Sequence, residues 1–213
     1  MMKIKVPFVR NLKKWKGNGW CGPIALASIL RYYRDRSSVE EIVKGADSSK
    51  RKGKEENSGG TSPEGLVFFC LSKGFNVDYI NKYGDFSYEQ KEYSKRFRKF
   101  LKDFGSKKYE QKFKGKNEKF SGYKFIRKSP TLKDIENYIR QKKPVLLYLN
   151  IAVPCNVDKL WPHYVVVVGF DDKNFYLHNI YPKNKAYQKI LKDVFVQSWK
   201  SDGMNDSLII PYK

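Results

Sequence analysis

Cys21 lies in a segment whose residue types could make it a nucleophile. It stands in the run Asn18-Gly19-Trp20-Cys21-Gly22-Pro23, directly before an apolar, helix-like stretch that continues to Tyr33. A cysteine at a helix N-terminus lies among unpaired backbone N–H groups and the positive end of the helix dipole, which favour its thiolate over its thiol. Because the thiolate is the form that attacks acyl carbonyls, the sequence predicts a nucleophilic Cys21.

A base for this nucleophile has few candidates, because the chain contains only two histidines. His163 opens the apolar run that continues to Phe170, whereas His178 lies inside the following apolar run, where a packed or surface histidine is typical. Asn179 ends that second run, 16 residues after His163. Together these residues suggest a Cys, His and Asn set in which His163 is the one plausible base.

The spacing between the two runs leaves the orienting residue open. In a simple hairpin with its turn at residues 171–174, Asn179 lies opposite Val166, so its contact with His163 needs strand coiling or a β-bulge. Asp171 and Asp172 are alternative orienting residues, although aspartates at these positions are also ordinary turn residues.

Composition excludes several classes of protein. A chain of 213 residues with 40% hydrophobic residues can bury one sizeable core. The absence of a long apolar run or an N-terminal apolar segment predicts a cytoplasmic protein without a membrane span. Cys21, Cys70 and Cys155 cannot all pair and are too scattered for a zinc cluster, which indicates a reducing compartment. We expect Cys70 and Cys155 to be small buried apolar residues, and the chemistry needs no cofactor or metal.

Positive charge dominates the chain and concentrates in one segment. The formal net charge is +21, and residues 81–128 hold 16 basic and 6 acidic side chains. Such a field attracts nucleic acid, anionic lipid surfaces or acidic proteins. The alternative to a binding role is that these are ordinary solvent-exposed lysines on the protein surface, which the excess of Lys over Arg favours.

Periodicity and capping signals predict a mixed chain. The interval 48–60 is typical of a loop. The segment that follows the predicted helix 87–104, up to about residue 119, is typical of a loop or hairpin. The predicted helices cover 24–33, 37–44, 65–73, 87–104, 129–139 and 189–200, and the predicted strands cover 3–9, 75–80, 144–149, 164–170, 175–178 and 207–212.

An ordered set of motifs resembles the C39-like cysteine peptidases of the papain-like superfamily, the group that includes bacteriocin-leader-processing peptidases. The matching stretches are Cys21-Gly22-Pro23-Ile24-Ala25-Leu26, Gly60-Thr61-Ser62-Pro63, Lys143-Pro144-Val145-Leu146-Leu147, His163 to Asp171, and Phe195 with Trp199. The resemblance implies an α+β, papain-like fold in which a helical lobe carries the nucleophile helix and packs on an antiparallel β-sheet. It covers a single domain, residues 1–213, with a basic insertion at about 81–128.

By the same resemblance, Cys21 is the nucleophile, His163 the base and then the acid, and Asn179 the orienting residue. The family places a glutamine six residues before the cysteine as an oxyanion donor, and this chain has Trp15 there. Asn18, three residues before Cys21, is the candidate substitute for that donor, and Asn11 is the alternative. Losing one such donor lowers the rate about a hundredfold to a thousandfold.

Three functions fit these residues. The first is a cysteine peptidase that cleaves a peptide or protein substrate, with the family's preference for small residues or glycine before the cut. The second is a catalytically impaired, peptidase-like binding module for a polyanion or acidic protein, which Trp15 and the basic segment favour. The third is a thiol acyltransferase that uses the same residues with an acceptor other than water.

Overall fold

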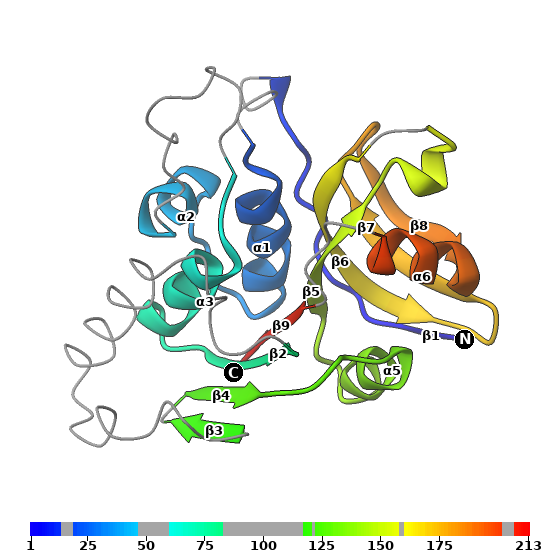
Figure 1. Ribbon diagram of the computed structural model, residues 1–213. Coiled ribbons are helices and arrows are strands. Elements are labelled where there is room, and N and C mark those ends of the chain that lie inside the picture. The colour runs from blue at the N-terminus through cyan, green and yellow to red at the C-terminus, as the bar shows by residue number, and fades with distance from the viewer. Residues whose placement is uncertain (14–18, 47–59, 83–116, 121, 158–159, 202–206) are drawn as a thin grey trace.

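The computed structural model describes residues 1–13, 19–46, 60–82, 117–120, 122–157, 160–201 and 207–213. Three helices, α1 (Cys21–Tyr32), α2 (Val39–Gly45) and α3 (Pro63–Ser72), form one lobe beside a twisted β-sheet (Figure 1). Two more helices, α5 (Leu132–Arg140) and α6 (Lys192–Lys200), and a short 3-10 helix, η2 (Val153–Cys155), pack around the rest of the sheet. The chain therefore has the α+β architecture that the sequence predicts.

The sheet is mainly antiparallel and runs through both parts of the molecule. Its order in the described residues is β3-β4-β2-β9-β5-β6-β7-β8, and β1 pairs with β6 outside that path. Among the strands that the structure describes, only β2 and β4 pair in parallel. The strands are β1 (Met2–Lys3), β2 (Asn76–Asn81), β3 (Asn117–Phe120), β4 (Tyr123–Ile126), β5 (Val145–Asn150), β6 (Pro162–Phe170), β7 (Asn174–Asn179), β8 (Lys185–Leu191) and β9 (Ser207–Tyr212).

Side-chain caps explain where three helices begin. Ser38 and Glu41 form a reciprocal capping box at α2, and Thr131 and Asp134 form another at α5. At α3 the Ser62 side chain accepts from the Gly65 N–H, and proline takes up the first helical turn. The capping signals in the sequence therefore predicted these starts to within a few residues.

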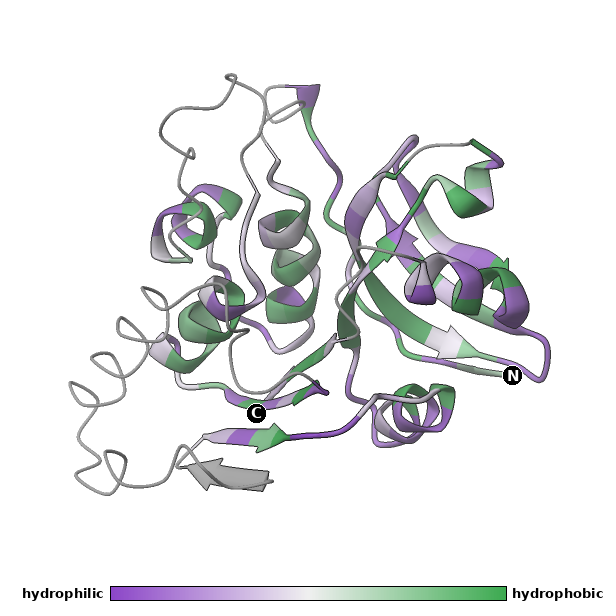
Figure 2. Cartoon of the chain, viewed as in Figure 1, coloured by the Kyte–Doolittle hydropathy of each residue, from purple (hydrophilic) through white to green (hydrophobic). Residues whose placement is uncertain are grey.

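Helix α1 is buried along most of its length, from Gly22 to Leu30. It packs against β6 on one side and against α2 and α3 on the other (Figure 1). In Figure 2, α1 and β6 are coloured mainly green, so both elements consist largely of hydrophobic residues. Because it lies inside the core, this helix fixes Cys21 relative to the sheet.

Two predicted elements differ from the structure. The last helix begins at Lys192 rather than at residue 189, because residues 185–191 form β8 and satisfy the backbone groups of β7. The first strand comprises only Met2–Lys3; Ile4 still donates to the Val168 carbonyl, and Pro7 follows without an N–H to extend the ladder. Neither change moves the predicted site residues.

The hairpin of β6 and β7 has a register different from the one expected from its turn. His178, not Asn179, lies opposite Val166, because the register shifts between Val167 and Gly169. Continued by one residue, this register places Asn179 opposite Val165 and nearer to His163. A β-bulge, one of the two features expected from the sequence to allow contact with His163, is therefore present.

The basic segment lies only partly within the described residues. Its first residues end β2, and its last residues form β3 and β4, which extend the sheet beyond β2. The helix predicted at 87–104 falls outside the described residues, and so does the loop predicted at 48–60 except for its last residue.

Candidate active site

Cys21 is the first residue of α1, at the point where the helix meets β6. The preceding residue, Trp20, makes no side-chain cap, so backbone N–H groups of the first turn remain for other acceptors. The backbone N–H groups of Tyr164, Gly22 and Cys21 itself lie near enough to the thiol to lower its pKa. An extra Cβ on Gly22 would lie 3.1 Å from the Tyr164 ring. Cys21 is therefore held beside the residue that directly follows His163.

The thiol of Cys21 is not primed in the way that the sequence predicts. Burial raises its pKa, and the three N–H groups lower it by less. The helix start supplies the expected positive environment, but the surrounding apolar residues disfavour an anion more strongly. The shift therefore favours the thiol over the thiolate at this partly exposed cysteine, in the direction opposite to the one that the helix start alone predicts.

His163 is buried and neutral as well. It exposes 7% of its surface, and burial lowers its pKa from 6.5 to about 4. Among the described residues, its Nε2 has no hydrogen-bond partner. An unpaired buried ring nitrogen is costly, so this atom is available to a group that enters the site.

Asn179 lies on the neighbouring strand and is fully buried, but it bonds elsewhere. Its Oδ1 accepts from the Tyr181 N–H at 3.0 Å, and its Nδ2 donates to Gln188 at 2.9 Å. Within the described part of the chain, no hydrogen bond joins Asn179 to His163, or His163 to Cys21. The three residues lie on the adjoining elements α1, β6 and β7, and no hydrogen bond links them in the described part of the chain.

Aromatic rings flank His163. The Tyr181 ring centroid lies 5.9 Å from that of His163 and 4.1 Å from that of Trp161. Asn150 positions this wall, because its Oδ1 accepts from the N–H groups of Trp161 and Ala152 at 2.8 and 3.1 Å. Sequence reasoning missed Asn150 as a positioning residue, although its place at the end of a buried strand was a usable signal.

The alternative orienting residues have structural roles. The Asp171 carboxylate accepts from Tyr176 and from the backbone N–H groups of Lys173 and Asn174, which closes the β6–β7 turn. These bonds hold the pKa of Asp171 well below its usual range. Asp172 follows it in the same turn. Both are turn residues, as the simpler interpretation of the sequence predicted.

The remaining histidine and cysteines also have clear places. His178 is buried and bonds through Nε2 to the Val6 carbonyl at 2.8 Å, so it is a packed residue. Cys70 is fully buried, as expected. Cys155 is half-exposed, which corrects the expectation that it is buried, because it lies at the end of the short helix η2.

Of the candidate oxyanion donors near Cys21, only some lie within the described residues. Trp15 and the predicted donor Asn18 lie outside the described residues. The Cys21 N–H, at the uncapped start of α1, is a donor of the kind that stabilises a tetrahedral oxyanion.

The sequence matches a family model across nearly its whole length. The model of the Peptidase_C39 like family matches residues 3–206. The chain belongs to this family. A search of curated proteins found no match to this C39-like chain.

Solved structures of C39 peptidase domains share the fold. A Bacillus anthracis protein described as a C39-like peptidase has 14% sequence identity and a TM-score of 0.61, with 100% of this chain and 98% of that chain covered. The peptidase domain of Streptococcus ComA, a bifunctional ABC transporter involved in quorum sensing, has 16% identity and a TM-score of 0.54, with coverage of 99% and 98%. A double-glycine-motif protease from an AMS/PCAT transporter, solved with its leader peptide, has 16% identity and a TM-score of 0.50, with coverage of 99% and 93%.

Two further searches of the C39-like chain gave negative results. Among the described residues, no group of three or more His, Cys, Asp or Glu side chains could hold a metal ion. Within the same part of the chain, every helix is too short or too polar to cross a bilayer.

Proposed function

We propose that this C39-like chain is a cysteine peptidase in which Cys21 attacks the peptide carbonyl and His163 transfers the proton. The observation that carries the proposal is the position of the Cys21 thiol, at the start of α1 and against the backbone N–H of Tyr164. The family and the fold support the reaction class.

The proposed reaction starts from a neutral pair. As Sγ forms a bond to the carbonyl carbon, its proton moves to His163, and the oxyanion accepts from the Cys21 N–H. His163 then donates the proton to the leaving amine, and water hydrolyses the thioester. Because catalytic hydrogen bonds in unliganded proteins often form only with substrate, the missing Cys21–His163 bond is compatible with this sequence.

In the same proposal, Asn179 orients His163 once substrate is bound. Its carboxamide lies on the strand next to β6, near the bulge that displaces the register. An amide oxygen can hold one imidazole tautomer without adding a charge. The present bond from the Tyr181 N–H to Asn179 must then be exchanged or shared.

We further propose a peptide substrate with small residues before the cut. The related double-glycine-motif protease was solved with a leader peptide, which supports a glycine-containing recognition sequence. Trp161 and Tyr181 beside His163 support a narrow site, because large rings occupy space that bulky substrate side chains would need. The three free cysteines are consistent with the cytoplasmic location that we propose.

The decisive variant is Cys21→Ala, assayed with internally quenched peptides that carry Gly-Gly, Ala-Gly or Leu-Leu before the cut. We expect cleavage of the small-residue peptides by the natural chain and a loss of at least about a thousandfold in the variant. Circular dichroism and thermal unfolding should be unchanged, because the substitution removes only one sulfur.

Cys155→Ser is the matched control, since Cys155 is a half-exposed thiol outside the proposed machinery. It should retain full activity. Cleavage that survives Cys21→Ala would contradict the assignment of the nucleophile. A natural chain that neither cleaves these peptides nor is labelled at Cys21 by a glycyl-glycine chloromethyl ketone would contradict the peptidase proposal.

A second function, polyanion or acidic-protein binding, rests on a separate observation. Residues 81–128 carry 16 of the 43 basic residues of the chain and only 6 acidic residues. We propose that this segment supplies such binding whether or not Cys21 is active.

A further inference from the structure

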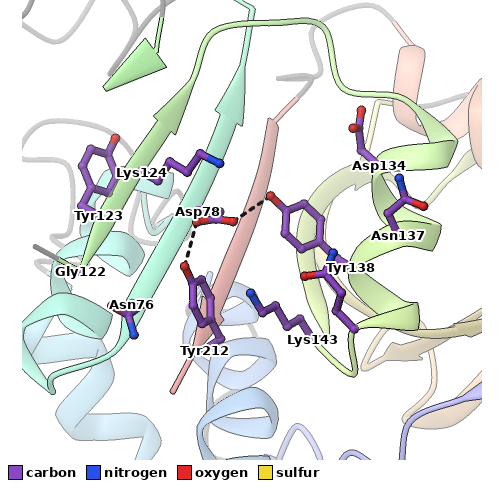
Figure 3. Close-up of a pocket in the computed structure, with 11 residues that line it drawn as sticks. Asn76, Asp78, Gly122, Tyr123, Lys124, Asp134, Asn137, Tyr138, Lys143 and Tyr212 are labelled. Carbon is purple, nitrogen blue, oxygen red and sulfur yellow. Dashed lines mark hydrogen bonds between the residues drawn. The ribbon is translucent and has the colours of Figure 1, made fainter. Parts of the chain in front are cut away.

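A polar pocket lies away from the candidate active site, between β2, β4, β9 and α5 (Figure 3). Its volume is about 440 Å³, within the range of small-molecule sites. Tyr32, the last residue of α1, donates to the Lys142 carbonyl beside this pocket, whereas Cys21 begins the same helix. A helix of 12 residues is about 18 Å long, so the two sites are separate.

The pocket holds a buried carboxylate. Asp78 exposes only 6% of its surface, and the hydroxyls of Tyr138 and Tyr212 donate to its two oxygens at 2.8 and 3.2 Å. Figure 3 shows a dashed line from each of the two tyrosines to this carboxylate. Asp78 forms no ion pair with any residue that the structure describes. Two neutral hydroxyls leave its charge uncompensated and leave lone pairs on its oxygens for another donor.

Two lysines line the same pocket without a carboxylate partner among the described residues. They are Lys124 from β4 and Lys143 after α5. The Lys143 ammonium lies 3.5 Å from the centroid of the Tyr212 ring, so an aromatic face holds it at the pocket. Both lysines are labelled around Asp78 in Figure 3. The other acid of the lining, Asp134, is already paired with Lys128.

Uncharged polar groups complete the lining. The side chains of Asn76 and Gln141 form no hydrogen bond with another part of the described chain. The Asn137 oxygen accepts from Arg140, which leaves its Nδ2 available. These groups can both donate and accept, so the pocket suits a polar ligand rather than an apolar one.

We propose that this pocket binds a small zwitterion, a free α-amino acid or a short peptide. The ligand ammonium would bind the Asp78 carboxylate, and its carboxylate would bind the ammonium groups of Lys124 and Lys143. A ligand with only a positive charge would be repelled by the lysines, and one with only a negative charge by Asp78. A zwitterion satisfies both, and the amides around it supply neutral hydrogen bonds.

Binding is tested by NMR titration of the ¹⁵N-labelled full chain. The probes are L-alanine, L-glutamate, L-lysine and glycylglycine, with N-acetylglycine lacking the ammonium, glycinamide lacking the carboxylate, and maltose as an uncharged polyol. We expect at least one zwitterion to shift the backbone signals of β2, β4 and α5 at millimolar concentration. N-acetylglycine and glycinamide should bind at least about tenfold more weakly than glycylglycine or L-alanine. Comparing the affinity for glycylglycine with that for the amino acids shows whether the pocket prefers a short peptide or a free amino acid.

Variants assign the two ends of the ligand. Asp78→Asn keeps the shape of the side chain in the pocket and should weaken zwitterion binding at least about tenfold. The double variant Lys124→Gln with Lys143→Gln tests the carboxylate end independently if Asp78→Asn unfolds. Lys133→Ala, an exposed position on α5 outside the lining, should bind as the natural chain does.

Three results would overturn the proposal. One is the absence of shifts from every zwitterion at millimolar concentration. Another is equal or tighter binding of maltose or of a singly charged probe. The third is zwitterion binding that both the Asp78 variant and the double lysine variant retain.

Discussion

At the scale of the residue, burial decides the charge state of the candidate site. Both helix-start N–H groups and a strand N–H lower the pKa of Cys21, yet burial outweighs them. Burial also lowers the pKa of His163, which favours its neutral form. The sequence could predict which residue types meet, because motif order and the scarcity of histidines limit the choices. It could not predict this charge state, which depends on how many apolar side chains the fold places around the pair.

A neutral resting pair predicts a steep pH dependence of Cys21 alkylation. Because burial raises the thiol pKa, the thiolate fraction should rise about tenfold per pH unit between pH 7 and 9. The measurement is the rate of iodoacetamide labelling at Cys21, by mass spectrometry, in a Cys155→Ser background. A preformed ion pair would instead give a rate nearly independent of pH down to the acid range, and that profile would refute the neutral pair.

His163 also predicts how stability depends on pH. Its folded-state pKa, about 4, lies below the ordinary 6.5, so the unfolded chain binds a proton more readily between these values. The free energy of unfolding should therefore decrease as pH falls from 6.5 to 4, by at most about 3 kcal/mol from this group. Urea unfolding of the natural chain and of His163→Gln at pH 7 and 4.5 measures the difference.

His178 needs its own control, since burial lowers its pKa in the same direction. His178→Gln should remove only its own share of the acid sensitivity. If His163→Gln unfolds with the same pH dependence as the natural chain, the proposed burial of a neutral His163 is wrong.

At the scale of the element, local signals predicted most helices and strands, and long-range pairing decided the rest. Ser38 with Glu41 and Thr131 with Asp134 are capping pairs that can be found in the sequence alone. Strand β8 could not be found in this way, because only its pairing with β7 makes residues 185–191 a strand. The bulge after Val167 is similar: an extra residue in one strand has no reliable sequence mark, yet it changes the partner of Asn179.

The close packing around Gly22 indicates that the site depends on how α1 packs on the sheet. An added methyl would lie 3.1 Å from both the Leu66 and the Tyr164 side chains, tighter than ordinary contact. Gly22→Ala should lower the free energy of unfolding by about 1–2 kcal/mol and peptidase activity by at least about tenfold. Both follow because α1 must move away from β6. Chemical unfolding and kcat/KM measure the two effects, and Arg31→Ala, at an exposed position of the same helix, is the control. Unchanged kcat/KM in Gly22→Ala would contradict a close dependence of the site on this contact.

At the scale of the whole molecule, charge and fold carry separate information. The motifs predicted the α+β peptidase fold, because an ordered set of short matches constrains topology. The polar pocket was not predicted, since Asp78, Tyr138 and Tyr212 come from three elements far apart in the sequence. Nothing in the local pattern of any one element marks their convergence.

The net charge of +21 predicts salt-dependent binding of polyanions. We expect the affinity for a single-stranded oligonucleotide, measured by fluorescence anisotropy, to fall steeply from low to physiological salt. A chain in which the lysines and arginines of residues 83–116 are replaced by glutamine should show a much smaller slope. An equal number of replacements on exposed lysines elsewhere is the control, and equal slopes in the two variants would assign the effect to general charge rather than to the segment.

Asn150 holds together the two ends of the interval 151–161 beside His163. Its side chain joins the two ends of the interval 151–161, and the Ile151 N–H also donates to the Trp161 carbonyl. Because these bonds fix the ends, the residues between them can be lengthened at small entropic cost, about 0.6 kcal/mol for each doubling. For the proposed peptidase, loop grafting at this interval is thus a route to altered substrate selectivity that leaves the strand of His163 intact.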